Sequence, residues 1–342
     1  MIQEMITFKL PDALNASAPP ERRGVRRDHV RLLVLDRVSG RTHHVQFNQL
    51  PNFLKAGDVL VLNSSRTIPA ILKAVLSRFS DVINHDVEVR LARRQNDSKW
   101  EALIVEEGVK EGDSLHFNDG LEGMVTYTSD SSPLATIQFS KKGTELLNHF
   151  YSIGEPVRYE YINQMWGLDY YQTVFAAQPG SVEMPSAGRA FSWELLFELQ
   201  RRGVKIVYLQ HHTGLSYFLD DKWNHSPEDN FEEYNIPENA WETILEAKES
   251  GNKVIAVGTT VVRAMETAVI SGTLSGWTNL YIQPDSKLKV ADAILTGLHE
   301  PEASHLSMLS AFVHQGILNQ AYQEAIDKGY LWHEFGDMNL II

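Results

Sequence analysis

The stretch KVIAVGTTVVRAMET, residues 253–267, decides the fold of this chain. Four apolar residues, 254–257, end at Gly258, which is the pattern of a short buried strand in a parallel sheet. Thr259 and Thr260 follow, and either hydroxyl is a candidate to cap the free backbone N–H groups of a starting helix. The apolar residues after the turn repeat on one helical face. The stretch therefore predicts a strand, a tight turn and a helix.

Such a turn brings free N–H groups, two hydroxyls and Arg263 to the carboxyl end of a strand, where open α/β sheets bind ligands. A second interpretation is a capped turn that binds nothing, with Arg263 paired to Glu266 three residues along the helix. The turn is not a phosphate-binding loop of a known type, because neither GxxxxGK[ST] nor GxGxxG is present.

Composition narrows the class of protein. The 342 residues suffice for two domains, and 43% hydrophobic residues provide for a substantial core. The absence of cysteine excludes disulfides, thiolate zinc sites and cysteine nucleophiles. No apolar run approaches the ~20 residues of a membrane span, and the first residues lack the pattern of a signal peptide. These features predict a cytoplasmic protein.

The net charge of −13 argues against non-specific binding of nucleic acid by the whole surface. One local cluster is basic, with Arg22, Arg23, Arg26 and Arg27 close together. These arginines are candidates to contact the phosphates of a nucleic acid, and a solvated basic arm is the alternative.

The predicted organisation is an α/β main domain with an inserted all-β barrel. Helices and strands alternate in residues 1–70 and 155–342, which we assign to one discontinuous domain. Residues 71–154 instead contain short candidate strands in succession, separated by turn residues such as Asn118-Asp119-Gly120. That texture is typical of a small antiparallel barrel.

Polar residues follow several of the predicted strands, at 63–66, 211–214, 258–263 and 296–299. If those strands are parallel neighbours, their carboxyl ends converge on one crevice. Thirteen histidines raise the question of a metal site, but no HxxxH pair is present and adjacent histidines in a strand point to opposite faces. We therefore predict no metal.

Seven motifs occur in order along the chain. They are RLLVLDR (31–37), GDVLVLN followed by R-x-I-P-A (57–70), YQTVFA (171–176), GSV-x-x-P-[ST]-A-G (180–188), VIAVGTT-x-VR (254–263), GWT (276–278) and FGD (335–337). With these motifs the chain resembles, over nearly its full length, the S-adenosylmethionine:tRNA ribosyltransferase-isomerase family of queuosine biosynthesis.

The resemblance implies a reaction. The family moves the ribosyl part of S-adenosylmethionine onto the 7-aminomethyl-7-deazaguanine base of tRNA, rearranges it to the epoxycyclopentane of epoxyqueuosine, and releases adenine and methionine. It implies S-adenosylmethionine as a substrate and tRNA as a partner. We also expect a monomer, with no metal and no membrane contact. A site of this kind needs a general base, a proton donor for adenine and a dry pocket.

The resemblance also implies site residues. His212 and His299 lie where the family has histidines and are the catalytic candidates. The candidates to bind S-adenosylmethionine are Asn63, Arg66, Tyr171, Gln172, Ser186, Gly188, Thr259, Thr260 and Arg263. Of these, Arg66, Thr259, Thr260 and Arg263 are expected to line one crevice with His299.

Some motif positions differ from the family pattern. Ser64 stands where the family has a carboxylate, and Ala190 and Asn230 stand where it has histidines. Neither Ala nor Asn transfers a proton near neutral pH. Two alternatives therefore stay open beside the family reaction: a diverged paralogue with another acceptor, and a non-catalytic protein that binds S-adenosylmethionine or RNA.

Overall fold

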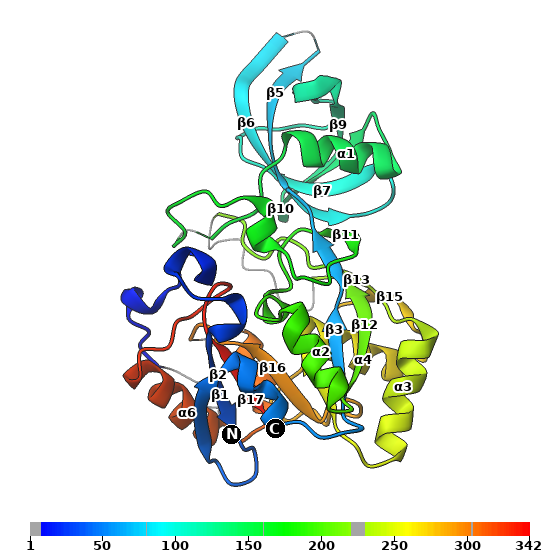
Figure 1. Ribbon diagram of the computed structural model, residues 1–342. Coiled ribbons are helices and arrows are strands. Elements are labelled where there is room, and N and C mark those ends of the chain that lie inside the picture. Colours follow the sequence, from blue (N-terminus) through cyan, green and yellow to red (C-terminus); the bar gives the residue numbers. More distant parts are fainter. Residues whose placement is uncertain (1–7, 80, 160, 220–229, 302–303) are drawn as a thin grey trace.

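The computed structural model describes residues 8–79, 81–159, 161–219, 230–301 and 304–342, and it consists of a mixed sheet with helices and a separate barrel (Figure 1). The order of the nine sheet strands is β15 (Ser275–Thr278), β13 (Glu232–Asn235), β12 (Lys205–His211), β3 (Val59–Asn63), β14 (Val254–Val257), β16 (Ala293–Gly297), β17 (Met338–Ile341), β1 (Arg31–Leu35) and β2 (Thr42–Gln46). β12, β3, β14 and β16 run parallel, which meets the condition under which their carboxyl ends converge.

The central strand β3 is buried on both faces, which explains its continuous apolar sequence. Val59 and Val61 point into a core formed with α3 (Glu238–Glu249), α4 (Thr259–Ser271), α5 (Ser304–Ser310) and α6 (Gln315–Asp327). Leu60 and Leu62 point into the opposite core, which contains α2 (Trp193–Arg201) and the 3-10 helix η4 (Phe47–Asn52). The sheet is therefore covered on both faces, so a ligand can reach it only at the ends of its strands.

The inserted segment forms a closed barrel, which confirms the predicted fold class. Its strands are β5 (Ile71–Arg78), β6 (Asp81–Arg94), β7 (Lys99–Ile104), β8 (Ser114–Phe117), β9 (Glu122–Ser129) and β10 (Ser132–Phe139), in the closed order β10-β7-β6-β5-β8-β9. Helix α1 (Gly143–Ile153) packs on the barrel, with the rings of Phe150 and Trp100 in edge contact at 5.6 Å.

Two short strands lie beside the connection between the sheet and the barrel. The chain leaves β3 through β4 (Ser65–Thr67), and β11 (Gln178–Ser181), which follows the return from the barrel, pairs with β4 in parallel and so runs in the same direction. The exit and the return themselves meet at Ile71 and Glu155, which form an antiparallel bridge. The domain limits at 70/71 and 154/155 stay a prediction.

The remaining elements are short. Strand β15 ends at Thr278, where the carbonyls of Thr278 and Leu280 accept hydrogen bonds from Arg263. The first residues contain the 3-10 helices η1 (Asp12–Leu14), η2 (Pro20–Arg23) and η3 (Arg27–His29). Two further 3-10 turns, η6 (Leu168–Tyr171) and η7 (Ser186–Gly188), precede α2, and η5 (Asn118–Gly120) lies in the barrel. Among the described helices none is long and apolar enough to cross a membrane.

Candidate active site between the sheet and the barrel

A cavity of about 1080 Å³ lies between the strand ends of the sheet and the barrel. Segments 213–218, 257–260 and 296–300, which follow β12, β14 and β16, line one side, and Tyr127 and Thr136 of the barrel line another. Three of the four polar segments expected to converge therefore do so, whereas segment 63–66 is not part of the lining.

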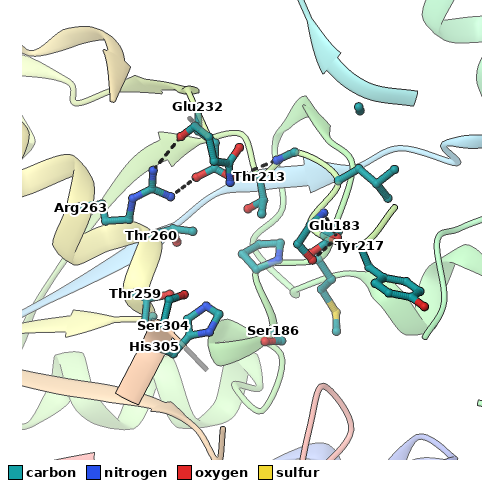
Figure 2. Close-up of a pocket in the computed structure, with 18 of the residues that line it drawn as sticks. Glu183, Ser186, Thr213, Tyr217, Glu232, Thr259, Thr260, Arg263, Ser304 and His305 are labelled. Carbon is teal, nitrogen blue, oxygen red and sulfur yellow. Dashed lines mark hydrogen bonds and ion pairs between the residues drawn. The ribbon is translucent and has the colours of Figure 1, made fainter. Parts of the chain in front are cut away.

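The turn before α4 depends on Gly258. Its φ of 95° lies in a region that favours glycine, and a Cβ there would lie 3.2 Å from that of Ala187. Gly258 itself is the N-cap, so the expectation that a threonine hydroxyl caps the helix is wrong. The Thr260 hydroxyl instead accepts a weak hydrogen bond from Asn63 Nδ2 (3.4 Å), and Thr259 faces the cavity (Figure 2).

Arg263 lines the cavity from the second turn of α4, and its guanidinium is held by its own chain. Nε donates to the Leu280 carbonyl (3.1 Å), Nη2 donates to the carbonyl of Asn230 (3.2 Å), and Nη1 forms an ion pair with Glu232 (Figure 2). The alternative pairing with Glu266 is wrong, because that carboxylate accepts the backbone N–H groups of residues 289–291. Arg263 therefore fixes the wall around it.

Glu232, which the sequence analysis did not select, is the centre of a buried cluster. Its Oε2 also contacts His211 Nε2 at 2.8 Å, and its Oε1 accepts the N–H of Gly214 at 3.1 Å. Burial opposes ionisation, but Arg263 and His211 outweigh it and lower the pKa of Glu232 to about 2. Burial lowers the pKa of His211 as well.

Two histidines stack at the cavity. His299 Nε2 contacts the Thr296 hydroxyl at 2.8 Å, and its ring lies parallel to that of His305, with centroids 4.6 Å apart and planes at 6°. Figure 2 shows His305 beside Thr259 and Ser304. Burial, with His305 and His333 adding to it, lowers the pKa of His299 well below its usual value. His305 was missed because no motif marks it.

The opposite wall carries tyrosines and carboxylates. Tyr159 and Tyr161 stack at 5.7 Å, and the ring of His333 continues the stack at 4.2 Å from Tyr161. The Tyr159 hydroxyl donates to Glu183 (2.9 Å), and the Tyr161 hydroxyl donates to Glu334 (2.6 Å). Removal from water raises the pKa of Glu334 to about 8 and also raises that of Glu183.

Other residues selected from the sequence lie elsewhere. Arg66 is exposed over the ring of Tyr151 (5.6 Å), outside the lining, so it does not share the crevice expected for it. Asn63 is buried and donates to the His211 carbonyl at 2.8 Å. His212 contacts Ser65 Oγ at 3.2 Å and lines a separate small cavity.

Of the candidates in the segment 171–188, one lines the cavity and the others do not. Ser186 lines the cavity (Figure 2). Tyr171 is buried against Phe335, and Gln172 holds both backbone groups of Thr67. Gly188 is buried where a Cβ would lie 2.9 Å from Phe175.

The arginine cluster lies outside the cavity lining. Arg22 sits over Tyr170 (5.2 Å) and Arg23 donates to the Phe335 carbonyl (2.6 Å). The other two form ion pairs at 3.0 Å, Arg26 with Asp28 and Arg27 with Glu21.

The two motif positions that lack the family's histidine lie in different parts of the structure. Asn230 lines the cavity, whereas Ala190 is buried in the core against α2. Within the described residues, no group of three His, Asp or Glu side chains has the spacing to hold a metal.

Comparisons with known proteins agree on one family. The model of a family described as "Queuosine biosynthesis protein" matches residues 3–341. S-adenosylmethionine:tRNA ribosyltransferase-isomerases from Carboxydothermus hydrogenoformans and Caldanaerobacter subterraneus are 34% and 35% identical, each over 98% of both chains. A crystal structure of S-adenosylmethionine tRNA ribosyltransferase from Thermotoga maritima is 27% identical, with a TM-score of 0.56 over 98% of this chain and 99% of that one. The chain belongs to the queuosine biosynthesis protein family.

Proposed function

We propose that this protein transfers and isomerises the ribosyl moiety of S-adenosylmethionine onto the 7-aminomethyl-7-deazaguanine base of tRNA, giving epoxyqueuosine. The observation that carries the proposal is the position of the VIAVGTT-x-VR motif. Its turn, with Thr259 and Thr260, forms one wall of the large cavity in a chain that matches the family from end to end. About 1080 Å³ exceeds the usual 300–1000 Å³ of a single small-molecule site. That volume suits S-adenosylmethionine together with one nucleotide.

The two walls suit different parts of the substrates. The first turn of α4 offers N–H groups and the Thr259 hydroxyl, which fit the carboxylate of the methionine part. Glu183 and Glu334 on the opposite wall fit positive charge, which both the sulfonium and the aminomethyl group carry. Among the candidates, Ser186, Thr259, Thr260 and Arg263 line this cavity with His299.

Binding of tRNA is proposed at the arginine cluster. Arg22 and Arg26 are exposed there, so they are the members best placed to meet phosphates. Replacing both by Ala should weaken tRNA binding and reduce the slope of log K against log salt by about 1–2. Filter binding at several salt concentrations measures this, and an unchanged slope would remove the cluster from the interface. We also propose a cytoplasmic monomer.

The deciding experiment measures adenine released from S-adenosylmethionine in the presence of tRNA that carries the aminomethyl precursor. Gly258→Ala tests the site, because an added Cβ meets Ala187 in the turn. Gly272→Ala is the matched control: its φ of 73° is also positive, at the other end of α4, but a Cβ there meets nothing within 4 Å. Both variants should lose about 1–3 kcal/mol of stability from backbone strain.

Only Gly258→Ala should lose S-adenosylmethionine affinity in calorimetry. Equal affinity of the two variants would remove the turn from the site, and wild-type protein that releases no adenine would end the proposed function.

A diverged paralogue is the second candidate, favoured by Asn230 at the cavity in place of a histidine. Adenine release with unmodified tRNA, or with another amine, at a rate equal to that with the precursor would select it.

A further inference from the structure

We propose that His305 is the base that removes a proton from the ribosyl carbon next to the sulfonium of S-adenosylmethionine. The inference rests on the proposed function and assigns a catalytic residue within it. His305 belongs to none of the seven motifs, and it reaches the cavity because α5 begins at Ser304, just after the segment that follows β16.

The position of the ring is the first argument. His305 lines the cavity beside Thr259 of the α4 turn (Figure 2). Its ring lies flat on His299 at 4.6 Å, and His299 is anchored by its contact with Thr296. The stack fixes the plane of the His305 imidazole and covers one face of the ring, so its edge, which carries the two nitrogens, is not covered by His299. A base must be held in this way to meet a carbon-bound proton.

The other histidines near the strand ends have partners of their own or line another cavity. His299 uses Nε2 on Thr296, and His333 uses its ring nitrogens on Asn15 (2.9 Å) and Glu300 (3.3 Å). His211 is fully buried on Glu232, and His212 lines the other cavity.

No described residue forms a hydrogen bond or ion pair with His305. In the part of the chain that the structure describes, it is thus the cavity histidine with both ring nitrogens left for a substrate, whereas His299 keeps only Nδ1.

The charges around His305 favour the form that accepts a proton. His305 is exposed at the cavity. The protein packed around its ring and the positive charge of Arg263 lower its pKa, and Glu232 opposes both. The neighbouring His299 is held neutral in the same way. A neutral imidazole at neutral pH is the state a general base requires.

The proposed step is a proton transfer from carbon to the imidazole nitrogen. The C–H bond next to the sulfonium breaks, its electron pair stays on the carbon beside the positive sulfur, and the proton forms a new N–H bond on His305. That pair can then form a double bond to the adjacent ring carbon, whose bond to the ring oxygen breaks, and the oxygen uses the released pair to form a C=O bond at the carbon that bears adenine. The bond to adenine breaks in turn, its electron pair leaves with adenine, and the imidazolium of His305 can return a proton to that leaving group. Asn230, at the same cavity, can carry no proton in either direction.

The test uses S-adenosylmethionine deuterated at that carbon, tRNA carrying the precursor, and the full-length protein. Both adenine release and loss of deuterium to water are followed for the wild type, His305→Gln and His305→Ala. His85→Gln is the matched control, because His85 is exposed on β6 of the barrel and lies outside the cavity lining. His305→Gln should slow both processes about 10²–10⁴-fold, with S-adenosylmethionine affinity within a few-fold of the wild type.

Added imidazole should restore part of the activity of His305→Ala, a response that a merely structural role would not give. Wild-type rates for His305→Gln would overturn this assignment and leave the proposed function intact. Loss of S-adenosylmethionine binding in both variants, without rescue, would also overturn it, because His305 would then shape the pocket. A wild-type protein that neither releases adenine nor loses deuterium would overturn both proposals.

Discussion

The two walls of the cavity hold the same side chain in opposite electrostatic states. Glu232, on the α4 side, is buried against Arg263 and His211, and its pKa is lowered to about 2. Glu334, on the tyrosine side, is also removed from water, but its described hydrogen-bond partner is the neutral hydroxyl of Tyr161, and its pKa is raised to about 8.

The difference shows what burial does with and without a compensating cation. Burial disfavours the charged form of both carboxylates, and only Glu232 has an arginine that outweighs this penalty. The negative charge of Glu232 on the α4 wall is consequently compensated within the protein. Glu334 on the tyrosine wall is neutralised by a proton or needs a cationic ligand. We infer that the α4 wall sets the shape of the cavity and that the tyrosine wall responds to what binds.

The largest expected effect comes from removing the carboxylate of the ion pair between Glu232 and Arg263. Glu232→Gln keeps the shape of the side chain but leaves the partly buried guanidinium of Arg263 without its carboxylate. Loss of one partner from a buried pair costs about 3–5 kcal/mol of unfolding free energy. Denaturant unfolding at pH 7 measures it, with Glu246→Gln as control, because its ion pair with Lys205 is exposed and worth at most about 1 kcal/mol. Equal losses in the two variants would contradict the comparison.

The same variant predicts a change with pH. The folded-state pKa of Glu232 is depressed from 4.5 to about 2, so its contribution to stability is present above pH 4.5 and is lost as the pH falls toward 2. Glu232→Gln should lack this part of the acid sensitivity.

An effect of similar size and opposite sign is expected on the tyrosine wall. The pKa of Glu334 is raised from 4.5 to about 8, so its contribution is present in full below pH 4.5 and is lost as the pH rises through 8. Glu334→Gln, which mimics the protonated form, should be more stable than the wild type at pH 9 by about 3–5 kcal/mol and similar at pH 4. Unfolding at pH 4, 7 and 9 tests this, with the exposed Glu107→Gln as control. A parallel pH dependence of wild type and Glu334→Gln would show that Glu334 is ionised without penalty.

The smallest effect concerns the hydrogen bond from Tyr161. Tyr161→Phe keeps the stack with Tyr159 and His333 but removes the hydroxyl that lowers the pKa of Glu334. The pKa should therefore rise further, and stability should fall by about 1 kcal/mol at pH 7. Carboxyl-carbon NMR titration measures the first quantity and denaturant unfolding the second. The exposed Tyr127→Phe serves as control, and a lower pKa in Tyr161→Phe would reverse the assigned role of the hydroxyl.

The parts of the fold that were predictable are those written in local patterns. Continuous apolar runs mark β3 and β14, because both faces of these strands are buried. Short strands separated by turn residues mark the barrel, whose strands bury side chains in a common core. Gly258 likewise marks its turn, since its backbone conformation favours glycine. The threonine caps failed because that glycine takes the N-cap position itself.

The site was less predictable because its contacts join distant segments. Glu232 meets His211 through the antiparallel pairing of β12 and β13, and no local pattern shows which carboxylate will lie opposite. Glu334 meets Tyr161 across a still longer separation. Arg66 follows a correctly predicted strand, yet it lies in β4, which leads into the barrel, and it is not part of the cavity lining. A strand end predicts the edge of a sheet but not the direction in which its side chains continue.

The pairing of β1 with β17 has a consequence for synthesis on the ribosome. Leu32 lies beside Met338, so β1 cannot form this pairing until the ribosome has made a strand about 300 residues further along the chain. The barrel strands are consecutive and close on themselves, so the barrel can form while β1 and β2 are still without their neighbour. We expect the nascent chain to expose the unpaired backbone groups of this strand until β17 emerges. Over that interval it should depend on chaperones to avoid aggregation.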